Sequence, residues 1–129
     1  MMFSKITSNI KVSVVPEYDS KNSYPSENRY VFKYSILIEN EGDFPIKILK
    51  RKWLIFDVGF GYTEIIGDGV IGLTPEIAPG DSFNYFSNVM LRSGAGNMGG
   101  KYLVKNMDTQ ESFEIDIPKF NLLSAILSN

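Results

Sequence analysis

The longest pattern in the chain is an alternation of apolar and polar positions between Arg29 and Asn40, in the stretch RYVFKYSILIEN. One face of this stretch carries aromatic and β-branched residues throughout, namely Tyr30, Phe32, Tyr34, Ile36 and Ile38. A two-residue period in such residues is typical of a half-buried β-strand. We predict a strand here, and we expect its aromatic face to form the core together with residues 83–85.

The same period recurs along the rest of the chain. It is found in residues 10–14, 46–57, 82–91, 101–106 and 112–117. Stretches rich in Gly, Pro, Asn and Asp separate these runs, and such residues favour chain reversal, at 41–45, 60–69, 78–81, 93–100 and 107–111. Five to seven short strands at this spacing predict an all-β fold, a sandwich or barrel of antiparallel strands.

The two ends of the chain fall outside these strands. We predict a single domain over residues 1–129, with an N-terminal extension at 1–8 and a C-terminal tail at 118–129. Pro118 cannot donate a ladder hydrogen bond, so it is predicted to end the last strand. The apolar run at 120–127 is the best helix candidate, and it is expected either to pack on the sandwich or to dock on a second copy as a weak homodimer.

Two missing residue types narrow the chemistry. The chain of 129 residues has no cysteine and no histidine. Ser-His-Asp and Cys-His catalysis, and metal sites built on imidazole or thiolate, therefore cannot form within one chain. We expect no catalytic residues, no metal site and no cofactor.

Charge and hydropathy limit the classes of partner that the chain is expected to bind. The net charge is −2 and the sequence pI is about 5.1, whereas nucleic-acid binding usually requires a basic surface. No apolar run approaches the ~18 residues that a membrane span needs. The first residues, MMFSKITSN, also lack the apolar stretch of a signal peptide. A cytoplasmic protein that neither binds nucleic acid nor inserts into a membrane is expected.

Residues 67–72 read GDGVIG, which matches the G-x-G-x-x-G spacing of dinucleotide-binding loops. Such a loop follows a strand, which the β-like residues YTEII at 62–66 could form, and it holds pyrophosphate at the N-terminus of a following helix. Residues 73–81, LTPEIAPGD, contain two prolines that exclude this helix. The glycines are therefore interpreted as structural, permitting positive φ or close backbone approach at a crossover between sheets. The alternative is a nest of backbone amides that binds an anion without a helix.

A basic cluster, Lys47, Lys50, Arg51 and Lys52, precedes Trp53. Strand geometry places apolar and basic residues on both faces of this run, so one end of the strand is expected to project from the sheet. We interpret Trp53 as a core residue and the lysines as protection of an exposed edge. The alternative is a patch for an anion or an acidic partner.

Two acidic residues share a face of the last predicted strand. Glu114 and Asp116 alternate with the apolar Phe113, Ile115 and Ile117. Nothing apolar lies near these acids in sequence to perturb a pKa, so we interpret them as a solvated face and not as a catalytic pair.

Five motifs in fixed order resemble the ApaG family over residues 8–129: RKW at 51–53, GDGVIG at 67–72, APGDSFNY at 78–85, GNMGGKY at 96–102 and IDIPKF at 115–120. The resemblance implies an immunoglobulin-like or fibronectin-III-like sandwich of two antiparallel sheets with about seven strands. It implies an association with cobalt resistance and magnesium efflux in bacteria, and protein contacts for eukaryotic ApaG domains. It also implies that the glycine motif binds pyrophosphate-like groups.

We therefore expect a non-enzymatic interaction domain that binds another protein. Its candidate partner contacts are Lys50, Lys52, Trp53 and Phe120. The alternative is a module that binds phosphate, pyrophosphate or a nucleotide as an anionic ligand. Its candidate ligand contacts are Gly67, Asp68, Gly69, Gly72, Gly94, Gly96, Arg51 and Lys101.

Overall fold

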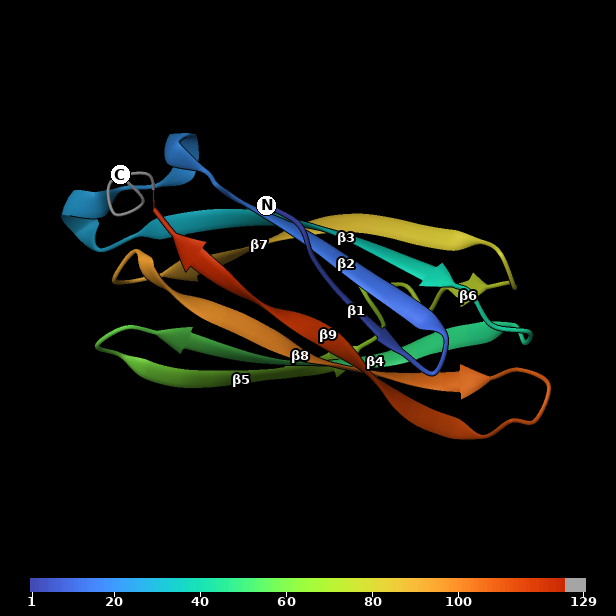
Figure 1. Ribbon diagram of the computed structural model, residues 1–129. Helices are drawn as coiled ribbons and strands as arrows, with labels where there is room; N and C mark the ends of the chain where they lie inside the picture. The colour runs from blue at the N-terminus through green and yellow to red at the C-terminus, as the bar shows by residue number, and fades with distance from the viewer. Residues whose placement is uncertain (125–129) are drawn as a thin grey trace.

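Two antiparallel sheets pack face to face in the computed structural model, which describes residues 1–124 (Figure 1). The first sheet has the order β1-β2-β3-β7, with β1 at Phe3–Thr7, β2 at Ile10–Tyr18, β3 at Tyr30–Asn40 and β7 at Ser82–Leu91. The second has the order β5-β4-β8-β9, with β4 at Ile46–Asp57, β5 at Gly61–Asp68, β8 at Ala95–Asn106 and β9 at Ser112–Leu123. A short strand β6, Glu76–Ile77, also pairs with β4.

The all-β sandwich is confirmed, with more strands than were predicted. Strand β1 lies in the expected N-terminal extension, and β5 lies in the 60–69 stretch that was predicted to be a turn. Two 3-10 helices, η1 at Ser20–Asn22 and η2 at Pro25–Glu27, link β2 to β3. No helix within residues 1–124 is long and apolar enough to cross a membrane.

The core lies between the two inner faces, as the alternation predicted. Its centre is a group of three aromatic rings from both sheets. The ring centroid of Tyr34 on β3 lies 5.4 Å from that of Trp53 on β4 and 5.9 Å from that of Phe120 on β9. The rings of Trp53 and Phe120 meet edge to face at 90°. Because aromatic residues bury large areas, this group links the two layers.

A β-bulge explains the mixed faces of β4. The register of β4 against β8 shifts between Ile48 and Lys50, so Leu49 is the extra residue. Ile48 before the bulge and Trp53 after it therefore both point inward, which two-residue alternation alone would forbid. The expectation that one end of this strand projects from the sheet is wrong. The lysines also guard no edge, because β4 lies between β5 and β8.

A second bulge keeps β9 continuous through Pro118. The register of β9 against β8 shifts between Met98 and Gly100, opposite Pro118 and Lys119. Proline is tolerated at a bulge on an edge strand because no ladder hydrogen bond is required there. The prediction that Pro118 ends the strand is wrong. The predicted helix at 120–127 is wrong over Phe120–Leu123, which belongs to β9, and residues 125–129 lie outside the described residues.

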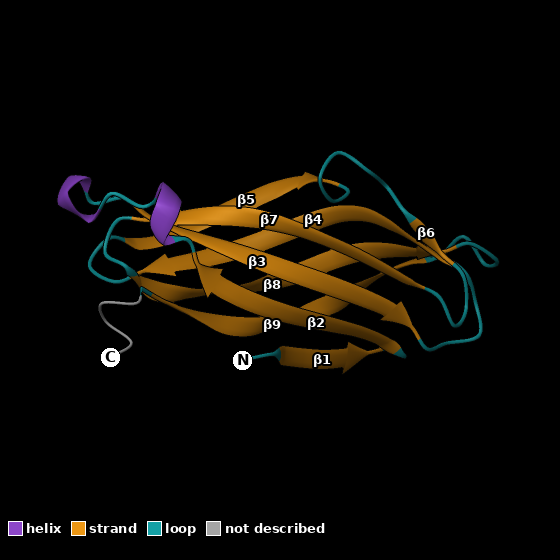
Figure 2. Cartoon of the chain, turned by 90° about the horizontal axis from the view of Figure 1, so that it is seen from above, coloured by secondary structure: helices purple, strands orange, loops and turns teal. Residues whose placement is uncertain are grey.

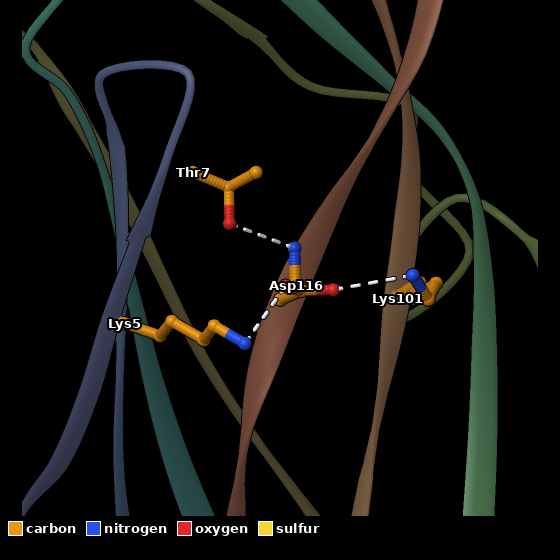
Figure 3. A network of polar contacts seen from close by, with 4 residues as sticks. All are labelled: Lys5, Thr7, Lys101 and Asp116. Carbon is orange, nitrogen blue, oxygen red and sulfur yellow. Dashed lines mark hydrogen bonds and ion pairs between the residues drawn. The ribbon is translucent and has the colours of Figure 1, made fainter.

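The two long sides of the sandwich differ. On one side β1 and β9, the edges of the two sheets, lie next to each other, whereas β5 and β7 form the other side (Figure 2). Two side chains tie β1 to β9 (Figure 3). The N–H of Asp116 donates to Thr7 Oγ1 at 3.1 Å, and Lys5 Nζ lies 2.9 Å from Asp116 Oδ2. We call this the closed side, and the side of β5 and β7 the open side.

Candidate functional site

The segment GDGVIG leaves β5 and forms a tight loop towards β6. Both of these strands pair with β4, so the segment connects strands of one sheet and is not the crossover between sheets that was expected. The predicted positive φ is confirmed at Gly69 (+57°) and Gly72 (+78°). A Cβ on Gly69 would lie 1.9 Å from the carbonyl oxygen of Leu73, so only glycine fits there. No helix follows, because the chain continues into β6.

Several polar groups of this loop already have partners. The Gly69 N–H donates to the carbonyl of Leu49 at 2.7 Å, and Val70 and Leu73 exchange two backbone hydrogen bonds of 2.8 Å. Arg51 Nη1 donates to the carbonyls of Asp68 at 2.7 Å and Gly69 at 3.2 Å. The Arg51 guanidinium also fills the space where Gly67 would carry a side chain. These groups, offered as anion ligands by the sequence, stabilise the loop itself.

The remaining candidate ligand residues lie elsewhere. Gly96 pairs with Asp57 at one end of β4, whereas Gly67 pairs with Arg51 six residues away. At ~3.3 Å per residue, these positions are ~20 Å apart. Gly94 packs against the ring of Tyr30, so it lies near the same end as Gly96. The two glycine segments are therefore not brought together.

Arg51 and Lys101 occupy opposite faces of their sheet. Arg51 shares the inner face with the buried Trp53, two residues along β4. Lys101 pairs with Lys52, and both side chains are about half exposed on the outer face. A single ligand held by both residues would have to pass through the sheet.

The candidate partner contacts divide in the same way. Trp53 is only 3% exposed and Phe120 only 1% exposed, so neither can contact a partner on the folded domain. Their assignment as partner contacts is wrong, because both belong to the core. Lys50 and Lys52 are exposed on the outer face of β4 and remain accessible.

The two acidic residues of β9, Glu114 and Asp116, have different surroundings. Glu114 is exposed. Asp116 is held by Lys5 on β1 and by Lys101 on β8, whose Nζ lies 3.3 Å from Asp116 Oδ1 (Figure 3). Hydrogen bonds from Lys5 and Lys101 hold the pKa of Asp116 below its usual value. No group of three or more Asp and Glu side chains placed to hold a metal occurs within residues 1–124.

Two tyrosines form a polar link between the sheets that the sequence did not single out. The hydroxyls of Tyr85 on β7 and Tyr102 on β8 are 2.5 Å apart in the core. Burial raises the pKa of both hydroxyls, and it raises that of Tyr34 as well. Each hydroxyl partners the other, so this pair satisfies buried polar atoms and joins the two layers.

The open edge of β5 is the accessible feature that the sequence interpretation missed. Every residue of β5 except Gly67 is exposed, including Tyr62 at 68%, Ile65 at 43% and Ile66 at 63%. Since Gly69 donates to Leu49 and antiparallel bonds recur at every second residue, the N–H and C=O of Ile66 point away from β4. The β-like residues YTEII at 62–66 made a short strand plausible, but its place at an open edge of the sheet could not be read from the sequence.

The chain resembles known proteins over nearly its full length. A family model for the ApaG domain matches residues 20–106. Protein ApaG of Mesorhizobium japonicum is 43% identical over 121 residues, covering 94% of this chain and 92% of that protein. Protein ApaG of Brucella abortus is 40% identical over the same shares.

A solved structure agrees with the sequence relatives. The crystal structure of a Bordetella pertussis protein assigned as ApaA superimposes with a TM-score of 0.86 at 36% identity, covering 90% of this chain and 94% of that one. The sequence resemblance, the family model and the shared fold lead to one conclusion: the chain belongs to the ApaG family.

Proposed function

We propose that this chain is a non-enzymatic protein-interaction domain that binds an extended segment of another protein along the edge of β5. The observation that carries the proposal is the exposure of this strand on both faces, beside backbone groups that no strand within residues 1–124 pairs with. A strand in this state adds a further strand from a partner through main-chain hydrogen bonds, and pockets for alternate side chains supply the specificity.

The composition of β5 supports this role. Natural edge strands are usually protected by lysine, proline, a bulge or a covering segment. The β5 sequence GYTEIIGD contains neither lysine nor proline, and its register against β4 is unbroken. An incoming strand would contact exposed apolar side chains on both faces, such as Ile65 and Ile66.

The test compares two substitutions at Ile66. Ile66→Pro removes an outward-pointing N–H and places a ring on the open edge, whereas Ile66→Thr keeps the N–H and the β-branched shape. Affinity capture from an extract of the source cell, read by quantitative mass spectrometry, should retain one protein with the wild type and Ile66→Thr. The same protein should be lost with Ile66→Pro.

A second measurement locates the contact. In the complex, hydrogen exchange at the Tyr62, Glu64 and Ile66 amides should slow, because an added strand would accept from them. A second copy of the chain as the strand donor would appear as a concentration-dependent dimer in sedimentation. If capture does not distinguish the two Ile66 variants, or if protection falls elsewhere, β5 is not the docking edge.

The glycine-loop ligand is the weaker candidate function. Arg51 and the Gly69 amide are engaged within the fold, which weighs against a free anion site at this loop. Calorimetry with pyrophosphate, ADP and a diadenosine nucleotide tests ligand binding at this loop. A saturable binding heat that is lost in Gly72→Ala would support the ligand-binding function. The association with cobalt and magnesium rests on the family resemblance alone. Under our proposal, the domain would affect these cations through the protein that it binds.

A further inference from the structure

We infer that a groove on the outer face of the five-stranded sheet docks an acidic segment of a protein partner. The groove encloses about 530 Å³ and crosses the strands from Tyr62 on β5 to Lys5 on β1. It rests on the proposed function in one respect, that the domain binds a protein. The groove and the β5 edge share Tyr62 and Glu64, but the groove lies over the face of the sheet and Ile66 does not line it.

The floor of the groove has no side chain at Gly99. Gly99 on β8 lies on the outer face, where it pairs with Leu54 of β4. On its other side lies the β9 bulge, and a Cβ at Gly99 would come within 3.2 Å of the Lys119 Cα. Leu54 is 47% exposed and Tyr62 68% exposed beside this floor. The floor of the groove therefore offers exposed apolar surface to a side chain from a partner.

The walls carry an excess of positive charge. Two carboxylates line the groove, those of Glu64 and Asp116. Four lysines line it as well, namely Lys5, Lys52, Lys101 and Lys119. The net charge of these lysines and carboxylates together, +2, contrasts with the −2 of the whole chain. Within residues 1–124, Lys119 forms no ion pair, and Lys52 has only a long contact of 3.9 Å to Glu64. These two ammonium groups are the ones with capacity for an additional anion.

Two of these lysines oppose each other directly. Lys52 and Lys101 form a cross-strand pair, with side chains 52% and 50% exposed. Like charges directly opposite each other destabilise a sheet, and each of these lysines contacts one carboxylate, Lys52 that of Glu64 and Lys101 that of Asp116. The carboxylates Glu64 and Asp116 lie on the outer sides of this pair, so the space between the two lysines is where an incoming carboxylate would be stabilised most.

The shape favours a polypeptide over a small anion. An inorganic anion would contact one or two lysines and leave most of the groove empty. A segment that alternates carboxylates with an apolar residue matches both the lysine walls and the apolar floor between Leu54 and Tyr62. Nucleic acid fits poorly, because every nucleotide adds a phosphate charge and the carboxylates of Glu64 and Asp116 line the same groove.

The test uses a fluorescent peptide of glutamate and leucine, with a matched peptide in which glutamine replaces glutamate. Fluorescence anisotropy at low salt should show saturable binding of the acidic peptide only, and the binding should weaken as salt is added. The double variant Lys52→Gln/Lys119→Gln should bind the acidic peptide about tenfold more weakly, since each exposed charge contact contributes up to about fivefold.

The chain supplies a matched control. Lys47 and Lys105 oppose each other on the same two strands but lie outside the groove. Lys47→Gln/Lys105→Gln makes the same change in net charge, and it should weaken binding less than about twofold, the size expected from long-range screened charge alone. In the wild type, NMR amide shifts caused by the peptide should concentrate at Leu54, Gly99 and Lys101.

Three results would overturn the inference. Equal loss in both double variants would show non-specific attraction, and absence of saturable binding by the acidic peptide would remove the site. Pyrophosphate binding in the groove, lost in Lys52→Gln/Lys119→Gln, with no peptide binding, would assign the groove to a free phosphorylated ligand instead. Because neither double variant alters β5, these failures are distinguishable from failure of the Ile66 test.

Discussion

The two edges of the five-stranded sheet are built in opposite ways. The β9 edge carries a proline, a bulge and Lys119, and β1 of the other sheet lies along it with Thr7 and Lys5 bound to Asp116. The β5 edge has none of these devices. Since unprotected edges invite pairing with other chains, the contrast indicates that the closed side serves stability, whereas the open side is available for binding.

The two edges also differ in how deeply their apolar side chains are buried. Phe120 on β9 is 1% exposed and packs on Tyr34 and Trp53. On β5, Ile66 is 63% exposed. Even Ile65, which pairs with the buried Trp53 across the two strands, is 43% exposed. The central aromatic group thus extends to the closed side through Phe120, whereas β5 leaves apolar side chains uncovered on the open side.

The largest expected effect tests this difference in burial. Phe120→Ala should lower the free energy of unfolding by ~3–5 kcal/mol, because a fully buried ring is replaced by a cavity. Ile66→Ala, on the open edge, should lower it by less than ~1 kcal/mol. Urea unfolding followed by circular dichroism measures both. Similar losses for the two variants would contradict the proposed asymmetry.

A smaller effect tests whether the loop that ends β5 is structural. Gly69→Ala should lower the free energy of unfolding by ~2 kcal/mol or more, because the residue has positive φ and its Cβ would overlap the Leu73 carbonyl. Gly72→Ala also has positive φ but meets no atom within 4 Å, so it should lose only ~1 kcal/mol. Thermal denaturation of the pair separates steric overlap from backbone strain. Equal shifts in melting temperature would remove the steric account.

The smallest effect concerns the polar tie of the closed side. Asp116→Asn removes two exposed ion pairs and should lower the free energy of unfolding by ~1 kcal/mol or less at pH 7. Because the folded-state pKa of Asp116 is lowered, its contribution is present above the ordinary carboxyl pKa and is lost as the pH falls below about 3.8 through the folded value.

The pH dependence provides the check on this tie. Unfolding measured between pH 7 and pH 3 should show the wild type and Asp116→Asn converging as the pH falls, and high salt should reduce the difference at pH 7. A difference that grows on acidification would mean that the carboxylate is not stabilised by Lys5 and Lys101.

Most strands could be predicted from the sequence because a two-residue period is a local property. The inner face of β3 follows from such a pattern. The structural role of Gly69 was also foreseen, because the prolines after the loop exclude a phosphate-binding helix. A short strand at 62–66 was considered plausible, but the flanking glycines placed 60–69 among the turns, and the exposed edge formed by β5 was not foreseen.

The candidate sites were predicted less well, because they depend on register. The bulge at Leu49 changes the phase of β4, so the inward set of side chains could not be assigned from alternation alone. For the same reason Arg51 and Lys101 were grouped together although they lie on opposite faces. The hollow over Gly99 depends on a bulge in a neighbouring strand.

The sequence by itself determined the class of fold and the aromatic composition of the core, because each depends on short-range periodicity and on residue type. Only the tertiary structure decided which edge is closed, which edge is open and where lysines converge. These features arise when distant segments are placed side by side, as when Thr7 accepts a hydrogen bond from the backbone of Asp116, 109 residues along the chain. No local pattern encodes such a contact, because its partners are selected by the packing of the two sheets.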